Sequence, residues 1–309
     1  MVLLCANEWR TAAGDGTMAA AAAAMVEPSL PECSGTRSIY LIRHAESRYN
    51  RAIKQRSLVK MIGETDHGLS VQGLAQCRSL QDRILKATQC ADAQALQATN
   101  RVTVSSPLCR AILTAHMALP PTHGAIVALP EAREHCMLPL LSRDSEGTLA
   151  SRLQQHVASE LVELVCGADC GLDKKEPPQP PCLDLSHLPP DQKWWTVAEG
   201  GHAVGLRIGT ALRKIADIAD AAPDAPTVLV GHSHAMRRIF STYSTAEFAD
   251  TPIGRRLGRE LVENCAVIRV RLKDQDGTGV HGAPPRVVDA ELLFGSNFRD
   301  EQSKSVDVV

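Results

Sequence analysis

The stretch Leu-Ile-Arg-His-Ala-Glu-Ser at residues 41–47 decides how this chain is interpreted. An apolar run at residues 39–42 ends abruptly in Arg43 and His44. A buried parallel strand has such a continuous apolar run, and its last residues bring side chains to the carboxyl edge of a sheet. A guanidinium offers a planar fork that matches phosphate oxygens, and an imidazole beside it can attack phosphorus. The stretch therefore predicts phosphate chemistry at a strand end.

Polar residues follow two further predicted strands. The strand Val102–Ser105 leads to Pro107 and then Arg110. Proline suits the first turn of a helix, where its missing N–H costs nothing, and a helix N-terminus attracts phosphate. A third strand, at residues 227–230, is followed closely by His232. Because ligands bind where the carboxyl ends of parallel strands meet, we expect these side chains to join those of the first strand.

Taken together, the three segments resemble the signature of the histidine phosphatase, or phosphoglycerate-mutase-like, superfamily. Residues 43–46 read Arg-His-Ala-Glu, with Ala45 where that signature usually has Gly. Residues 106–115 fit the family's Ser-Pro-Leu-x-Arg-Ala-x-x-Thr-Ala segment. The resemblance covers about residues 38–295. Its supporting matches are Asp66, Leu69, Ser70, Gly73 and Gln76, Glu199-Gly200 with Arg207, and Asn264-Cys265.

Predicted strands alternate with helices along the chain. Two more strands are predicted at residues 265–272 and 287–293. Helices are predicted from Val71, with Ser70 as its N-cap, to about Ala98, then from Pro107 to Pro120, and at residues 149–164 and 203–219. This alternation predicts an α/β fold, a three-layer α/β/α arrangement with a mostly parallel central sheet.

The resemblance also implies roles for individual side chains. His44 would be the nucleophile and would become a phosphohistidine. His232 would flank the phosphate on the opposite side and stabilise the transferring group. The implied phosphate-binding set is Arg43, Asn50, Arg110 and His232.

The general acid is expected between the second and third strand ends. Two carboxylates are candidates, Glu131 and Glu134. We favour Glu134, because the run Arg-Glu-His at residues 133–135 resembles the family variant in which this Glu is the acid. The Gly that usually follows is missing, so the choice between the two stays open.

The predicted reaction is hydrolysis of a phosphomonoester, with no cofactor and no metal, since arginines and histidines supply the positive charge. The alternatives are a phosphoglycerate-mutase-type phosphotransferase and a catalytically weak phosphate-binding module. The stretch Leu-Asn-Glu-Arg-His-Tyr-Gly of the metabolic mutases is missing here, which favours hydrolysis. The expected substrate is a small phosphorylated metabolite or a phosphoprotein. Its identity would depend on residues 135–195, which have little pattern.

One segment also fits a different enzyme class. Residues 228–235 also resemble the strand and elbow of the α/β-hydrolases, with Ser233 as nucleophile. That family places its acid and histidine after the serine, and the only distant histidine beyond it here is His281. The reading also leaves Arg43 and His44 without a role, so we set it aside.

Composition limits the partners and the compartment. The net charge is −2 and the basic residues are scattered, so neither nucleic acid nor a membrane is expected as a partner. The ten cysteines form no disulfide framework, which favours reduced thiols and a cytoplasmic location. Cys166, Cys170 and Cys182, near His187, do not have the spacing of a zinc site.

The predicted organisation has one domain. Residues 1–36 are expected to form a disordered leader, with a transit peptide as a weaker alternative. Residues 37–298 would form the α/β domain, with an inserted loop at about 166–193 that is rich in proline. Residues 299–309 would be a disordered tail. The sequence predicts no oligomeric state.

Overall fold

The computed structural model describes residues 36–62, 66–135, 150–167, 178–190, 194, 199–275 and 283–299. Within these residues a seven-stranded sheet has the order β4-β3-β2-β5-β1-β6-β7. The first five strands of that order pair in parallel, and β6 and β7 are antiparallel. The strands are β1 (Thr36–Arg43), β2 (Val102–Ser105), β3 (Ile126–Ala128), β4 (Leu183–Asp184), β5 (Thr227–Gly231), β6 (Val267–Lys273) and β7 (Arg286–Leu293).

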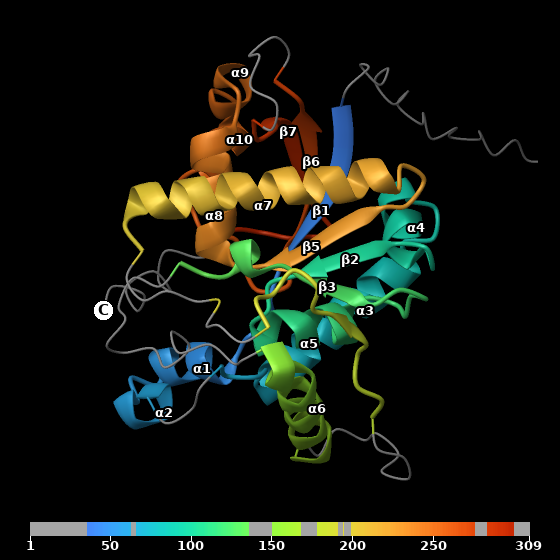
Figure 1. Ribbon diagram of the computed structural model, residues 1–309, viewed down its shortest axis with the longest axis vertical. Helices are drawn as coiled ribbons and strands as arrows, with labels where there is room; N and C mark the ends of the chain where they lie inside the picture. Colours follow the sequence, from blue (N-terminus) through green and yellow to red (C-terminus); the bar gives the residue numbers. More distant parts are fainter. Residues whose placement is uncertain are drawn as a thin grey trace, which may run out of the picture. The chain divides into compact units, whose positions relative to one another are not determined.

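Helices cover both faces of this sheet (Figure 1). One face packs on α3 (Val71–Lys86), α4 (Ala91–Gln97), α5 (Cys109–Ala118) and α6 (Ala150–Gly167). The other face packs on α7 (Gly201–Ala221), α8 (Ser233–Tyr243), α9 (Ala246–Ala249) and α10 (Pro252–Leu257). Three short elements complete the list: α1 (Arg48–Lys54), α2 (Leu58–Ile62) and the 3₁₀ helix η1 (Pro130–Ala132). The predicted three-layer, mostly parallel fold is confirmed.

The centre of the sheet explains why β1 reads as an unbroken apolar run. Tyr40 and Ile42 belong to the core on the α3 and α5 face, whereas Ile39 and Leu41 belong to the core on the α7 and α8 face. Since successive side chains of a strand point to opposite faces, a strand covered on both sides needs apolar residues at every position.

The single helix predicted from Val71 to about Ala98 is wrong. Ser70 does cap α3, since its Oγ accepts the Gly73 N–H at 3.1 Å, but α3 ends at Lys86. Side chains stabilise the turn that follows: Gln94 Nε2 donates to Thr88 O at 3.0 Å. Because of this turn, α4 packs in the same core as α3. A straight helix of that length would extend beyond the core.

Part of the predicted inserted loop belongs to the sheet. Within residues 166–193, Leu183–Asp184 form the edge strand β4, which pairs with β3, and Leu188 is buried. Residues 168–177 and 191–193 of this stretch lie outside the described residues, as do the leader up to residue 35 and the tail from residue 300. Short strands such as β3 and β4 give little periodic signal, which is why the sequence did not predict them.

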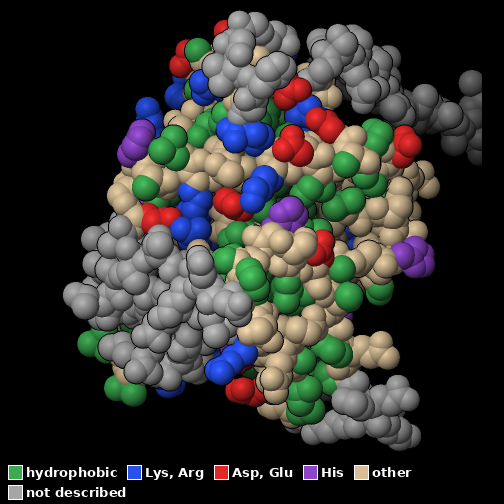
Figure 2. Space-filling model, viewed as in Figure 1, with side chains coloured by type: hydrophobic (Ala, Val, Ile, Leu, Met, Phe, Trp, Pro, Cys, Tyr) green, Lys and Arg blue, Asp and Glu red, His purple; other side chains and the backbone are tan. Residues whose placement is uncertain are grey.

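The face of the molecule shown in Figure 2 has no single dominant charge. Figure 2 shows acidic and basic side chains interspersed over the face that carries α7. Among the helices of the described ranges, none combines the length and the apolarity that crossing a bilayer requires.

Candidate active site

The turn that follows β1 is fixed by three neighbouring segments. The His44 N–H donates to Gly231 O at the end of β5, at 2.9 Å. The Ala45 N–H donates to Thr114 Oγ1 of α5 at 2.9 Å, and Asn264 Nδ2 donates to His44 O at 2.8 Å. The backbone of His44 is therefore held from the sheet, from α5 and from the turn before β6.

The ring of His44 has a defined tautomer when it is neutral. The side chain is buried, and Nδ1 lies 2.6 Å from the carbonyl oxygen of Ala45. A carbonyl oxygen can only accept, so Nδ1 must carry the proton and Nε2 the lone pair. Burial, followed by the charges of Arg110 and Arg43, holds the pKa of His44 well below its usual value. The neutral ring with a free electron pair on Nε2 is thus the favoured form.

His232 lies against His44, with 5.0 Å between the ring centroids. Its Nε2 is 2.8 Å from Ser106 Oγ, whereas its Nδ1 is buried and has no hydrogen-bond partner among the described residues. The pKa of His232 is also well below its usual value, because of burial and then the charges of Arg110 and His44. Both rings therefore favour the neutral state.

Two buried arginines complete this cluster. Arg43 ends β1, and its Nη1 donates to Val262 O at 2.5 Å. Arg110 lies in the first turn of α5 and is buried as well. Each guanidinium lowers the pKa of both histidines, so both charges act at the same place. The structure thus brings together four of the predicted site residues, from three strand ends that are far apart in the sequence.

Asn50 lies in α1, directly after this turn. It closes a capping box with Ser47: its Oδ1 accepts the Ser47 backbone N–H at 3.3 Å, and Ser47 Oγ accepts the Asn50 N–H at 3.1 Å. The amide oxygen is therefore engaged by the helix cap, and the amide nitrogen is the end left for a phosphate oxygen. Its predicted phosphate contact stays a prediction.

The two candidates for the acid differ in their surroundings. Glu131 lies in η1, and its Oε1 forms an ion pair with Lys214 Nζ at 2.8 Å. Glu134 is half-buried, and its Oε1 accepts the N–H of the next residue, His135, at 2.8 Å. The described contacts therefore commit Glu131 to an ion pair and leave Glu134 with a backbone contact.

A buried ion network anchors the segment that carries both carboxylates. Glu199 pairs with Arg133 and, at 2.7 Å, with Arg207. Arg207 Nη1 also donates to the backbone oxygens of Glu131 and Arg133, at 2.8 and 2.9 Å. Ala132 O lies 4.0 Å from the position that a Cβ on Gly231 would take, so this segment passes the end of β5. The network fixes the approach of residues 130–135 to His232.

The N-terminus of α5 is not open to a phosphate in the way that the sequence predicted. The carboxylate of Asp66 accepts the Cys109 N–H there, at 2.9 and 3.1 Å. Asp66, which the sequence offered only as a supporting match to the family, therefore caps α5. Arg110 of that helix, rather than its free amide groups, supplies the positive charge.

The sequence did not single out Arg299. Its backbone N–H donates to Leu261 O at 2.9 Å, beside Val262, whose carbonyl holds Arg43. The charge of Arg299 contributes to the lowered pKa of His44. This residue was assigned to the tail, and no local pattern marks it, because the contact joins segments that are far apart in the chain.

The cysteine cluster offers no site in the described ranges. Cys166 and Cys182 are exposed free thiols, and Cys170 lies outside the described residues. The described ranges contain no group of three histidine, cysteine or acidic side chains that could hold a metal ion.

Residues 39–147 match the family described as Histidine phosphatase superfamily (branch 1). No curated protein matches the chain.

Three similar solved structures have low sequence identity to this chain. A mycobacterial hydrolase is 17% identical to this chain, and the alignment covers 84% of this chain and 100% of the hydrolase, with a TM-score of 0.43. A putative alpha-ribazole-5'-P phosphatase from Escherichia coli is 15% identical, and the alignment covers 82% of this chain and 98% of the phosphatase, with a TM-score of 0.41. A phosphoserine phosphatase from Entamoeba histolytica is 15% identical, and the alignment covers 86% of this chain and 98% of the phosphatase, with a TM-score of 0.40. Over residues 39–147, the family match confirms the resemblance to the histidine phosphatase superfamily that the motifs in this range carry.

Proposed function

We propose that this protein is a metal-independent phosphomonoester hydrolase that works through a phosphohistidine on His44. The observation that carries the proposal is the hydrogen bond of 2.6 Å between His44 Nδ1 and Ala45 O. It places the lone pair on Nε2, inside a cluster with two buried arginines and a second histidine. An uncharged nucleophile surrounded by fixed positive charge is the arrangement that phosphoryl transfer needs.

In the first step, Nε2 of His44 attacks phosphorus in line and the bond from phosphorus to the leaving oxygen breaks. Glu134 in its protonated form gives its proton to that oxygen. Glu134 is preferred because Glu131 is paired with Lys214. The charges of Arg43 and Arg110 stabilise the transferring group, whose negative charge spreads over its oxygens.

In the second step, the Glu134 carboxylate takes a proton from water. The water oxygen forms a bond to phosphorus, the bond from nitrogen to phosphorus breaks, and its electron pair returns to Nε2. Inorganic phosphate leaves, and His44 is again neutral with its proton on Nδ1. Glu134 is protonated once more, so the cycle closes without another reactant.

His232 completes the pocket in this proposal. A buried ring nitrogen without a partner costs about 1–3 kcal/mol, and an oxygen of a bound phosphate would satisfy Nδ1 of His232. The proposed substrate is a small phosphorylated metabolite or a phosphoprotein. We also propose a cytoplasmic location, which the free thiols of all six described cysteines support.

The test is phosphate release from p-nitrophenyl phosphate in the presence of a chelator. The parent protein should be active, His44→Ala should be inactive, and His123→Ala, which removes an exposed histidine, should match the parent. A quench in base should trap a phosphorylated protein, since phosphohistidine survives base and is lost in acid.

Two results would redirect the assignment. Interconversion of phosphoglycerates faster than any phosphate release would identify a mutase. Binding of orthovanadate without turnover of any monoester would identify a phosphate-binding module.

A further inference from the structure

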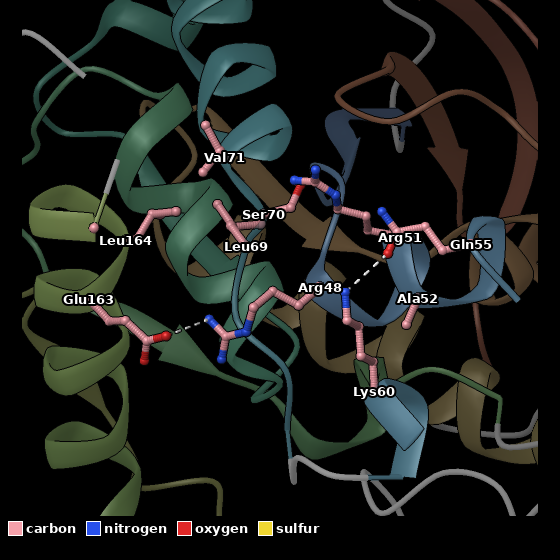
Figure 3. Close-up of a pocket in the computed structure, with 11 residues that line it drawn as sticks. Arg48, Arg51, Ala52, Gln55, Lys60, Leu69, Ser70, Val71, Glu163 and Leu164 are labelled. Atoms are coloured by element: carbon pink, nitrogen blue, oxygen red, sulfur yellow. Dashed lines mark hydrogen bonds and ion pairs between the residues drawn. The ribbon is translucent and has the colours of Figure 1, made fainter. Parts of the chain in front are cut away.

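A cavity lies outside the cluster of Arg43, His44, Arg110 and His232. It has a volume of about 430 Å³ and lies between α1, α2, the start of α3 and the last turns of α6 (Figure 3). Its walls combine apolar side chains with three cations and one carboxylate, among them Arg48, Arg51, Lys60, Glu163, Leu69 and Leu164. We call it the α1–α6 cavity.

The α1–α6 cavity is separate from the proposed phosphate site. Arg48, Arg51, Ala52 and Gln55 line it, and their spacing of three, four and seven residues puts them on one face of α1. At about 100° per residue, Asn50 lies roughly 150° away from the centre of that face. Asn50 therefore lies on a different side of α1 from the residues that line the cavity.

Arg48 forms a fixed wall rather than a free charge. Its Nη2 lies 2.9 Å from Oε1 and 2.8 Å from Oε2 of Glu160, and its Nη1 lies 3.9 Å from Glu163. Gly68 allows this pair to close, because a Cβ there would lie 1.9 Å from Glu160 Oε2. Figure 3 shows Arg48 extending from α1 across the cavity toward Glu163.

Arg51 and Lys60 supply positive charge that this pair does not cancel. Lys60 Nζ contacts the neutral Gln55 at 3.4 Å, and neither cation has an ion pair with the described residues. In Figure 3, Arg51 extends toward Ser70, where the positive end of the 16-residue helix α3 begins. This end of the cavity therefore favours an anion.

Part of the remaining wall is apolar. Ala52, Leu69 and Leu164 line the cavity. A cavity of a few hundred Å³ with an apolar surface and a few charged groups is typical of a small-molecule site. A site of this kind suits a ligand with both an apolar body and an acidic group.

We propose that the α1–α6 cavity binds a small organic anion, whose carboxylate or phosphate lies between Arg51 and Lys60 and whose apolar body lies against Leu69 and Leu164. This site is independent of the chemistry on His44. It gives the protein a binding function for an acidic metabolite in addition to its proposed reaction.

The test uses 8-anilinonaphthalene-1-sulfonate, an apolar anion that fluoresces when bound, and the full-length protein. The parent should bind it saturably. The double variant Arg51→Ala/Lys60→Ala should bind roughly tenfold more weakly, as expected for the loss of two partly exposed charge contacts. The matched control is Arg56→Ala, an exposed cation of the same segment that does not line the cavity, and it should bind like the parent.

Circular dichroism and phosphate release test whether the double variant is folded, and both should match the parent. Equal affinity of parent and double variant would overturn the proposal, as would the lack of saturable binding by the parent. A third titration separates the two sites: His44→Ala should bind the probe as the parent does. A loss in His44→Ala as large as in the double variant would place the probe in the active site and overturn the proposal.

Discussion

Acidification should destabilise the fold through the two active-site histidines. Burial and the neighbouring arginines hold the pKa of His44 and of His232 well below the usual value near 6.5. Above that pH both rings are neutral in the folded and the unfolded chain, so they contribute nothing to pH dependence. As the pH falls below 6.5, the unfolded chain takes up protons that the folded chain refuses, and stability is lost.

The magnitude follows from this linkage. Between pH 6 and pH 5, an unfolded histidine with a pKa near 6.5 is mostly protonated, and each buried neutral ring then costs about 1.2 kcal/mol. The two rings together cost up to about 2.4 kcal/mol over that interval, which is the limit reached when both stay neutral in the folded chain down to pH 5. The loss ends where the pH reaches the folded pKa values.

The assay is urea denaturation at pH 6 and pH 5 in a buffer free of phosphate, followed by tryptophan fluorescence, since Trp194 is buried. The parent is compared with His44→Asn and with His44→Asn/His232→Asn. The loss of stability over this interval should be smaller by up to about 1.2 kcal/mol in the single variant and by up to about 2.4 kcal/mol in the double variant. Other titrating groups, His116 included, are present in all three proteins and cancel. An equal loss in the parent and the double variant would show that the folded rings take up protons as readily as the unfolded ones, and would refute the lowered pKa of both histidines.

Three further predictions concern the groups around the nucleophile. Glu134→Gln should lower kcat for an alkyl phosphate by about 10²–10⁴-fold. The decrease should be smaller for p-nitrophenyl phosphate, whose leaving group needs no proton. Unchanged activity of Glu134→Gln together with a loss in Glu131→Gln would show that Glu131 is the acid. Thr114→Val leaves the buried Ala45 N–H without its acceptor and should cost about 1–3 kcal/mol in urea denaturation, together with a lower kcat; an unchanged midpoint would show that another group accepts this bond. Glu199→Gln leaves two buried guanidiniums without their shared carboxylate and should cost roughly 3–5 kcal/mol, measured in the same way; a cost below about 1 kcal/mol would mean that the network does not anchor residues 130–135.

The outcomes for individual elements show which inferences were local. The strand Val102–Ser105 has the predicted bounds, and β1, β5, β6 and β7 differ from their predictions by a few residues at their ends. These strands are buried on both faces, so their apolar runs are long enough to recognise. The short strands β3 and β4 lack such runs.

The helix predicted from Val71 to about Ala98 failed for a different reason. Its residues do favour a helix, and the turn between α3 and α4 depends on where the core lies. Packing against a sheet overrides local propensity when a straight helix would leave the core.

The sequence by itself determined the strand ends and the residue types placed on them, Arg43, His44, Arg110 and His232. Their order in the chain was enough because parallel strands deliver their carboxyl ends to one edge. Only the tertiary structure decided that Asp66 caps α5, that Arg299 approaches His44, and that a cavity lies between α1 and α6. Each of these depends on segments that are distant in sequence and meet through packing, and such contacts leave no periodic or local signal in the chain.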